Sequence, residues 1–408
     1  MRLTNEEQAM LAGEFGPGVQ KAIEIVVALG KIYGAEDLVP VTSVQVSGVS
    51  YKNLGEAGLE FLQDWADQGG KVRVPTTLNP AGLDLARWAE LGFSADFALK
   101  QDLVIQAFKA MQIQPTCTCT PYLVGNQPGF GEHLAWAESS AVSFANSVLG
   151  ARTNREGGPS ALAAAITGRT ARYGLHLPAN RRAQLVVDVQ CPILTPADFG
   201  ALGVMVGKKA RNRIPYFRNL AVPSPIADYL KALGAAMAAS GAVALYHIEG
   251  VTPEADLPEQ IGDKAEGIQI TTLQEGFANL NSTTNEKIDL VWIGCPHASL
   301  AELRHVISLL AGRPIKANLW ITMAREVRAE AEKRGLVAEL ASLGGQVVAD
   351  TCLVVAPIEE LGFQTVATPS GKGAYYIPSH TGLAVRYGSL EACIEAAVKG
   401  CWCKNCES

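Results

Sequence analysis

The chain repeats one pattern along most of its length: an apolar strand-like run, a polar or thiol-bearing loop, and a helical segment. Residues 39–46, 288–293 and 315–321 are strand-like runs of this kind. Strands that alternate with helices predict parallel sheets, because a parallel connection has to cross over the sheet and a helix provides that crossover. The sequence therefore predicts an α/β fold in layers. In such folds ligands bind at the loops that follow the strands.

Composition limits the class of protein. The chain has 408 residues, of which 48% are hydrophobic and 18% charged, so it can bury a large core in one α/β unit or a few lobes. The net charge of −6 comes with no basic block, which argues against nucleic acid or anionic lipid as a partner. Nine scattered cysteines fit a reducing cytoplasm better than a disulfide framework.

The start of the chain and its apolar runs bear on location. The first residues turn acidic at Glu6 and Glu7, where a signal peptide would turn apolar. No uninterrupted apolar run reaches the roughly 18 residues that a membrane helix needs. We therefore expect a soluble, cytoplasmic protein that does not associate with a membrane.

Local patterns place further elements. Thr4 followed by Glu7 has capping-box spacing and predicts a helix start. Further helices are expected at 83–91, 96–112, 131–150 and 160–168. Further strands are expected at 71–77, 114–122, 184–189, 242–248 and 374–377. The polar, Pro- and Gly-containing stretch 249–267 is the predicted hinge or crossover between lobes.

Three strand-like runs end in cysteine. The segments are Cys117-Thr118-Cys119-Thr120-Pro121-Tyr122, Gly294-Cys295-Pro296-His297 and Asp350-Thr351-Cys352. On a strand Cys117 and Cys119 would face the same side. The three segments are too far apart in sequence for a local metal-binding finger, so only the fold can bring them together. Three thiolates on a four-iron cluster would leave one iron open to substrate. The alternative is that each cysteine is a small buried hydrophobe.

Several polar loops are candidate ligand sites, each with a structural alternative. The loop 47–55 follows a strand and precedes a helix, so it is either a binding loop or a simple connection. Arg152 and Arg155 could hold an anion or pair locally. The 370–373 loop lacks the first glycine of a phosphate-binding P-loop, because position 366 is Val, yet Lys372 could still meet an anionic group.

Eight motifs in order give the chain a resemblance to a known family over nearly its whole length. The motifs are Val46-Ser47-Gly48-Val49-Ser50-Tyr51, Thr77-Leu78-Asn79-Pro80, Cys119-Thr120-Pro121-Tyr122, Ala137-Glu138-Ser139-Ser140-Ala141, Asn146-Ser147-Val148-Leu149-Gly150-Ala151-Arg152-Thr153-Asn154, Gly294-Cys295-Pro296-His297, Asp350-Thr351-Cys352 and Ser370-Gly371-Lys372. With these motifs the chain resembles the large, catalytic subunit of the aconitase X family, which includes phosphomevalonate dehydratases and cis-3-hydroxy-L-proline dehydratases. The resemblance implies an aconitase-like, multi-lobed α/β/α fold with parallel-rich sheets.

The resemblance also implies a site. By match to the family motifs, the ligands of an iron–sulfur cluster, 4Fe-4S, would be Cys119, Cys295 and Cys352, which leaves Cys117 as a neighbour. Substrate contacts would come from residues in four of the motifs, namely Gly48, Val49, Ser50, Asn79, Pro80, Glu138, Ser139 and Lys372. The catalytic base would be a serine on a partner subunit.

The implied reaction is the loss of water from a hydroxylated acid. The first expectation is conversion of (R)-5-phosphomevalonate, a small anionic substrate, to trans-anhydromevalonate 5-phosphate in an isoprenoid route. The alternative is dehydration of cis-3-hydroxy-L-proline, and a further alternative from another class is a non-catalytic thiol or zinc protein. The chain ends at residue 408 without the family's swivelling lobe, so we expect a small swivelling subunit as its partner in a heterodimer.

The end of the chain does not fit the family pattern. We expect a catalytic domain over residues 1–400 and a Cys-rich tail over 401–408. The tail carries Cys401, Cys403 and Cys406 at close spacing, and its terminal position predicts mobility rather than a structural metal site.

Overall fold

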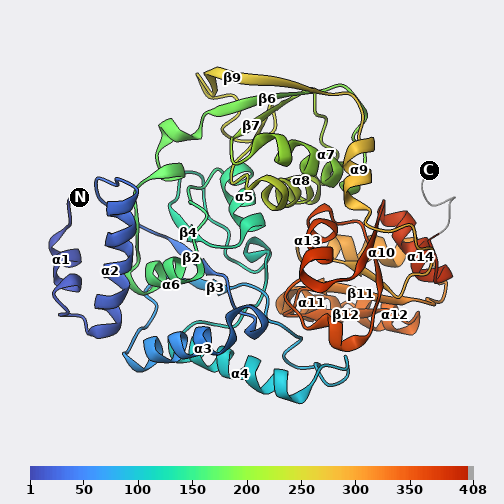
Figure 1. The fold of residues 1–408 in the computed structure, drawn as a ribbon, viewed down its shortest axis with the longest axis horizontal. Coiled ribbons are helices and arrows are strands. Elements are labelled where there is room, and N and C mark those ends of the chain that lie inside the picture. The colour runs from blue at the N-terminus through green and yellow to red at the C-terminus, as the bar shows by residue number, and fades with distance from the viewer. Residues whose placement is uncertain (403–408) are drawn as a thin grey trace.

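Three lobes meet around the middle of the molecule. The computed structural model describes residues 1–402. In Figure 1 the N-terminal lobe (α1 to η3) is blue to light green, the middle lobe (β6 to β9) is green to yellow, and the C-terminal lobe (α9 to α14) is orange to red. Each lobe has its own parallel sheet. The predicted α/β class with parallel-rich sheets is therefore confirmed.

The N-terminal lobe holds a three-stranded parallel sheet in the order β3-β2-β4 and a small antiparallel pair, β1-β5. The predicted capping box is confirmed, because Glu7 N–H donates to Thr4 Oγ1 and Thr4 N–H donates to the Glu7 carboxylate. The elements are α1 Asn5–Leu11, α2 Pro17–Ile32, β1 Leu38–Pro40, β2 Ser43–Val46, α3 Tyr51–Asp67, β3 Thr76–Leu78, α4 Ala95–Ala110, η1 Pro121–Leu123, β4 Leu134–Trp136, α5 Ser139–Ser147, α6 Gly158–Thr167, β5 Arg169–Ala171, η2 Gly174–His176 and η3 Pro178–Arg181.

The middle lobe is a four-stranded parallel sheet in the order β8-β7-β6-β9, with α7 and α8 packed against each other beside it. Its elements are β6 Ala183–Val189, α7 Pro196–Ala210, β7 Pro215–Arg218, α8 Ile226–Gly241, β8 His247–Ile248 and β9 Ile261–Ile270. Helix α8 also packs against α5 of the first lobe and α13 of the last, so it joins all three lobes.

The C-terminal lobe is a five-stranded parallel sheet in the order β12-β11-β10-β13-β14. Its elements are α9 Gln274–Leu280, β10 Leu290–Ile293, α10 Leu300–Leu310, β11 Asn318–Met323, α11 Arg325–Lys333, α12 Leu336–Ser342, β12 Gln346–Ala349, η4 Ile358–Leu361, β13 Thr365–Thr368, α13 Gly371–Thr381, β14 Ala384–Tyr387 and α14 Leu390–Lys399.

The central strand β10 shows why its sequence reads as a continuous apolar run. Leu290 and Trp292 lie in one buried cluster, and Val291 and Ile293 lie in the cluster on the opposite face. A parallel strand covered by helices on both sides buries every side chain, so it has no polar alternation. The strand ends at Gly294, where the Cys-Pro-His loop begins.

Several expected elements are wrong. Residues 374–377 lie in helix α13, which begins at Gly371 and is capped by Ser370, whose hydroxyl accepts from Gly373 N–H at 2.9 Å. Residues 85–92 form turns instead of a helix, and the Asp84 carboxylate accepts from the backbone N–H groups of residues 86 and 87 where these turns begin. The 249–267 hinge is instead partly β9, an edge strand that starts at Ile261.

Other expected elements are shorter or displaced. The strand expected at 71–77 is β3, at Thr76–Leu78, and only His247–Ile248 of the run 242–248 is a strand. The helix expected over 131–150 is divided between strand β4 and helix α5. The segment 114–122 is not a strand, because the backbone turns at Cys117, where φ is 44°.

The first two tail residues belong to the C-terminal lobe. Cys401 pairs with Lys287 as an antiparallel bridge, and Trp402 is buried in the core formed by β10, α10 and α14. The predicted mobility of the tail is therefore wrong for Cys401. Cys403 and Cys406 lie outside the described residues. Within residues 1–402 no helix is both long enough and apolar enough to cross a membrane.

Gly294 is required by its contacts as well as by its backbone angle. Its φ is +103°, and a Cβ there would overlap the carbonyl oxygen of Thr322. We expect Gly294→Ala to lower the free energy of unfolding by about 3 kcal/mol, because it adds a core overlap to the cost of a left-handed backbone. Urea unfolding followed by tryptophan fluorescence measures this.

Gly312 provides the matched control. Its φ is +74°, but among the described residues, its chain neighbours apart, no heavy atom lies within 4 Å of where its Cβ would be. Gly312→Ala should cost only about 1–2 kcal/mol, the cost of the left-handed backbone alone. Equal losses for both variants would show that the Thr322 contact is unimportant.

Candidate active site

The three cysteine-bearing loops converge where the N-terminal and C-terminal lobes meet. A hydrogen bond joins the thiols of Cys295 and Cys352. Cys119 lies close to both, because the charge of Cys295 raises the pKa of Cys119 and the charge of Cys119 raises the pKa of Cys352. Cys119 and Cys295 are buried, and Cys352 is partly buried. Burial and the nearby Glu138 charge raise the pKa of Cys119 to about 12. The hydrogen bond from Cys352, assisted by Lys372, lowers the pKa of Cys295 despite its burial.

Cys117 does not share this space. Its side chain is fully buried in the core of the N-terminal lobe, together with Leu78, Ala81 and Val104. Burial raises its pKa well above the usual value, as does the charge of Asp350. The turn at Cys117 therefore separates two thiols that a straight strand would have aimed at the same side.

His297 belongs to the Cys295 loop and bonds to the other two cysteine loops. Its Nε2–H donates to the carbonyl of Thr351 at 2.8 Å, and its Nδ1 lies 3.0 Å from the hydroxyl of Thr118. Its backbone N–H donates to Cys119 Sγ at 3.2 Å. Burial lowers the pKa of His297 to about 4, so the ring is neutral and Nδ1 accepts from Thr118.

A buried ion pair lies beside the thiols. Glu138 is the N-cap residue of α5, and its carboxylate pairs with the ammonium of Lys372 from the first turn of α13. The carboxylate also accepts from Asn79 Nδ2 at 2.8 Å and from Ser140 Oγ at 2.8 Å. Lys372 donates to Ser140 Oγ at 3.2 Å as well. These contacts join the 79–80, 138–140 and 370–372 motifs in one network.

The ion pair fixes the charges of both partners. Burial alone would raise the pKa of Glu138, but Lys372 and the hydrogen bonds lower it to about 2. Burial alone would lower the pKa of Lys372, but Glu138 raises it. Both groups are therefore charged at neutral pH. The site offers one ammonium and one carboxylate in a place largely shielded from water.

The 48–50 loop reaches the same region from the N-terminal lobe. Gly48 has a φ of 78°, which turns the chain out of β2, and Ser50 then caps α3. Ser50 Oγ donates to the carbonyl of Val355, three residues after Cys352. Val49 and Ser50 are almost fully buried. The Val49 carbonyl and the Ser50 hydroxyl are therefore fixed by hydrogen bonds within the protein.

The remaining predicted contacts lie at the ends of β3 and at the start of α5. Asn79 N–H continues the sheet by donating to Val46 at 2.9 Å, and Pro80 is buried beside it. Ala81 then pairs with Thr351, which brings this loop against the Cys352 loop. Ser139 is the first residue of α5 and is buried next to Glu138.

The donor set fits an iron–sulfur cluster. Two buried polar atoms at the site, Asn79 Oδ1 and Thr351 Oγ1, have no hydrogen-bond partner within residues 1–402, which is typical of a place where a ligand belongs. Three thiols from three loops match the ligand type that such clusters use. A cluster would take the place of the present contact between the Cys295 and Cys352 thiols. No group of three or more His, Cys, Asp or Glu side chains within residues 1–402 is arranged to hold a single metal ion.

Two residues that organise the site, His297 and Gln101, are not among the predicted site residues. In the sequence, His297 stands out only as part of the Cys-Pro-His motif. Gln101, fully buried on α4, accepts from the N–H groups of Tyr51 and Gly82 and donates to the carbonyl of Val49. In the sequence, the one feature that points to Gln101 is that a glutamine interrupts an otherwise apolar helix face.

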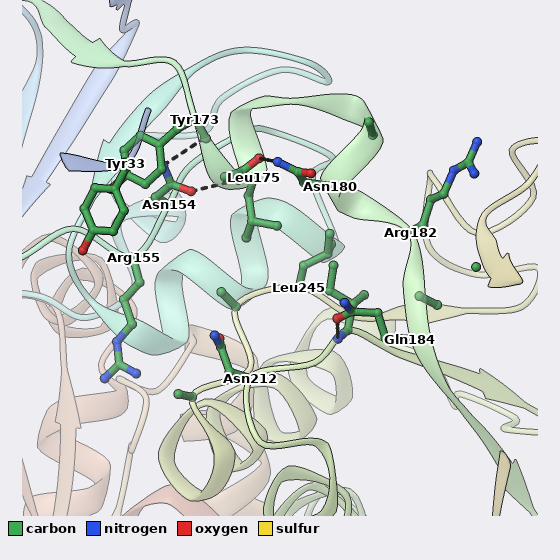
Figure 2. A pocket seen from close by; sticks show the side chains of 17 residues that line it. Tyr33, Asn154, Arg155, Tyr173, Leu175, Asn180, Arg182, Gln184, Asn212 and Leu245 are labelled. Carbon is green, nitrogen blue, oxygen red and sulfur yellow. Dashed lines mark hydrogen bonds between the residues drawn. The ribbon is translucent and has the colours of Figure 1, made fainter. Parts of the chain in front are cut away.

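Two cavities lie between lobes, and the second of them borders the convergence point at Cys295. One of 710 Å³, shown in Figure 2, lies between the N-terminal and middle lobes, with Tyr33 and Tyr173 on one wall and Arg182 on the other. Arg155 lines it too, and none of the cysteines does. The other, of 450 Å³, lies between the middle and C-terminal lobes and is lined in part by Lys231, Cys295 and Ser370.

Three family models together match most of the chain. They are described as Aconitase X first domain, second domain and third domain, and they match residues 1–179, 183–276 and 288–399. These matches follow the three lobes closely.

Full-length relatives agree with these models. The phosphomevalonate dehydratase large subunit of Methanocaldococcus jannaschii is 50% identical over 96% of this chain and 98% of the relative. The cis-3-hydroxy-L-proline dehydratase of Hypocrea jecorina is 38% identical over 98% of this chain but only 69% of the relative.

A solved structure supports the same relationship. The holo-form crystal structure of Thermococcus kodakaraensis aconitase X matches with a TM-score of 0.90 and 48% identity, over 97% of this chain and all of that one. At this level of identity the match extends beyond the fold to the family. The chain belongs to the aconitase X family.

Proposed function

We propose that this chain is the catalytic, large subunit of a hydro-lyase that converts (R)-5-phosphomevalonate to trans-anhydromevalonate 5-phosphate and water. The observation that carries the proposal is the convergence of Cys119, Cys295 and Cys352 beside the buried Glu138–Lys372 pair. The choice of substrate is supported by relatives named phosphomevalonate dehydratase large subunit, at 47–52% identity in four cases, against 37–38% for hydroxyproline dehydratases.

The three cysteines would hold an iron–sulfur cluster of the 4Fe-4S type. When bound, it would supply an iron that lacks a cysteine ligand and acts as a Lewis acid on the leaving hydroxyl. The relative from Thermococcus was solved in a holo-form, which supports a cofactor in this family. Because the pKa of Cys119 is about 12, its binding to iron releases a proton.

The chain's own residues bind and orient the substrate in this proposal. Lys372 holds an anionic group of the substrate as a fixed positive charge in a site with little water. Glu138 keeps Lys372 in place, and Asn79 offers its unpartnered carbonyl oxygen to a substrate hydroxyl. In this proposal the 48–50 loop, Pro80 and Ser139 also contact the substrate.

Dehydration also needs a base. The reaction removes a hydroxyl from one carbon and a proton from its neighbour, and a carbon–carbon double bond forms between them. We propose that the proton goes to a serine of a small, swivelling subunit, so that the active enzyme is a heterodimer. The name "large subunit" carried by several relatives supports such a partner. Residues 1–400 would then form the catalytic unit of this chain.

Anaerobic turnover by the reconstituted two-subunit enzyme tests the substrate. We expect formation of the anhydro product from (R)-5-phosphomevalonate and no turnover of cis-3-hydroxy-L-proline. Mass spectrometry of the products measures both. Turnover of hydroxyproline alone would replace the proposed substrate with the alternative. Turnover of neither by an iron-loaded heterodimer would overturn the assignment.

A further inference from the structure

His297 belongs to one of the three cysteine loops and bonds to the other two. It follows Cys295 by two residues. Its ring reaches Thr118, which precedes Cys119, and Thr351, which precedes Cys352. Its backbone N–H donates to the Cys119 sulfur itself. Each of these bonds therefore ends on a candidate ligand or on the residue directly before one.

The contacts of His297 leave it no other role in the site. The side chain is fully buried, and both ring nitrogens are occupied by protein groups, so neither is available to a substrate. The Thr118 hydroxyl is also fixed, since it accepts from Thr120 N–H at 3.1 Å and lies 3.1 Å from the Thr120 hydroxyl. The His297 ring therefore connects two loops, with one ring nitrogen bonded to Thr118 and the other to Thr351.

The backbone of His297 extends the connection to the third lobe. Lys231 on α8 lies with its Nζ 3.5 Å from the His297 carbonyl, and it also pairs with Glu302 on α10. The loops of the N-terminal and C-terminal lobes and one helix of the middle lobe thus meet at one residue.

We propose that His297 is the positioning residue of the cluster site: it sets the separation of the Cys119, Cys295 and Cys352 loops before any cluster is present. The proposal rests on the proposed function for its link to iron, but the positioning itself is a property of the metal-free chain. Hydrogen-bonded groups behind metal ligands commonly fix ligand orientation, and their loss typically costs 10–100-fold in metal affinity.

Thr118→Val is the sharpest test because it removes the partner of Nδ1 with little change in shape. Hydrogen exchange of the metal-free chain, read by mass spectrometry, should speed up by about tenfold or more in the 294–297 and 350–353 loops as well as around residue 118. Thr118→Ser keeps the hydroxyl and should restore the wild-type rates. Faster exchange confined to residues 116–121 would overturn the proposal.

Iron retention gives the second readout. After anaerobic reconstitution, Thr118→Val and His297→Gln should lose iron to a chelator about 10–100-fold faster than the wild type, while Thr118→Ser does not. His380→Gln, which changes an exposed histidine in the last turn of α13, is the matched control and should behave as the wild type.

The two proposals fail in different ways. Wild-type iron retention in both Thr118→Val and His297→Gln would overturn the positioning role and leave the function intact. A wild-type chain that takes up no iron would contradict the proposed function, and hydrogen exchange would still decide whether His297 couples the loops.

Discussion

Replacement of Cys119 by alanine is expected to abolish iron binding, whereas replacement of Cys117, two residues earlier, is expected to leave it intact. Cys119 lies with Cys295 and Cys352 beside the Glu138–Lys372 pair. Cys117 lies in the apolar core of the N-terminal lobe, on the other side of the turn at its own backbone. A cluster that loses one of its three thiolates loses a third of its protein ligands.

The two alanine variants are matched in size, burial and position in the sequence. Iron and acid-labile sulfide per chain, measured after anaerobic purification, should fall to background in Cys119→Ala and stay at the wild-type level in Cys117→Ala. Cys117→Ala should cost only about 1 kcal/mol of stability, because it leaves a small cavity in a packed core. If Cys117→Ala lost its iron and Cys119→Ala kept it, the ligand assignment would be wrong.

Replacement of Lys372 by methionine is expected to lower kcat/KM by at least about a hundredfold, mainly through KM. Within residues 1–402 Lys372 is the only lysine paired with Glu138, and a substrate anion would take up the positive charge of its buried ammonium. Loss of one partner of a buried, hydrogen-bonded charge pair typically costs about 3–5 kcal/mol, and about 1.4 kcal/mol corresponds to a tenfold change in an equilibrium constant. Steady-state kinetics with the iron-loaded heterodimer measure the effect.

The pH dependence of this variant has a definite sign. In the wild type the pKa of Glu138 is about 2, below its usual 4.5, so its contribution to stability is fully present above pH 4.5 and is lost as pH falls toward 2. Without Lys372 burial dominates and raises the pKa of Glu138. Lys372→Met should therefore lose stability as pH rises through that higher pKa, the reverse of the wild-type trend.

A double variant separates binding from stability. Glu138→Gln together with Lys372→Met removes both charges, and it should recover most of the stability lost in the single variant, since replacing a whole buried pair is often nearly neutral. It should not recover activity. Lys287→Met, which removes an exposed lysine paired with Asp289, is the control for loss of a lysine elsewhere. Activity restored in the double variant would show that Lys372 acts only through folding.

The sequence predicted the buried parallel strands well because their physics is local. Residues 288–293 and 315–321 read as continuous apolar runs, and they form β10 and β11, which are covered on both faces. β9 was missed because it is an edge strand with Asp263, Lys264 and Glu266 exposed, so it reads as a polar linker. For α13, Tyr375, Tyr376 and Ile377 favour a strand, but the segment forms a helix that is capped by the Ser370 hydroxyl.

The site was predictable in its parts but not in its assembly. Glycine turns, strand ends and cysteines after apolar runs marked the loops, and the family resemblance chose among their residues. What the sequence could not show is which distant groups meet. The partners of the His297 ring lie 179 and 54 residues away, and the Lys372–Glu138 pair spans 234 residues. Such contacts depend on how the lobes pack, which no local pattern records.

The metal content of the wild-type chain, purified without oxygen, is the most direct test of the cysteine site. The account predicts a brown protein with broad visible absorption and with iron and acid-labile sulfide present together. A single structural zinc would need four nitrogen or sulfur ligands and would give no visible absorption. A colourless chain that contains zinc but neither iron nor sulfide would contradict the account, and would favour a non-catalytic thiol protein.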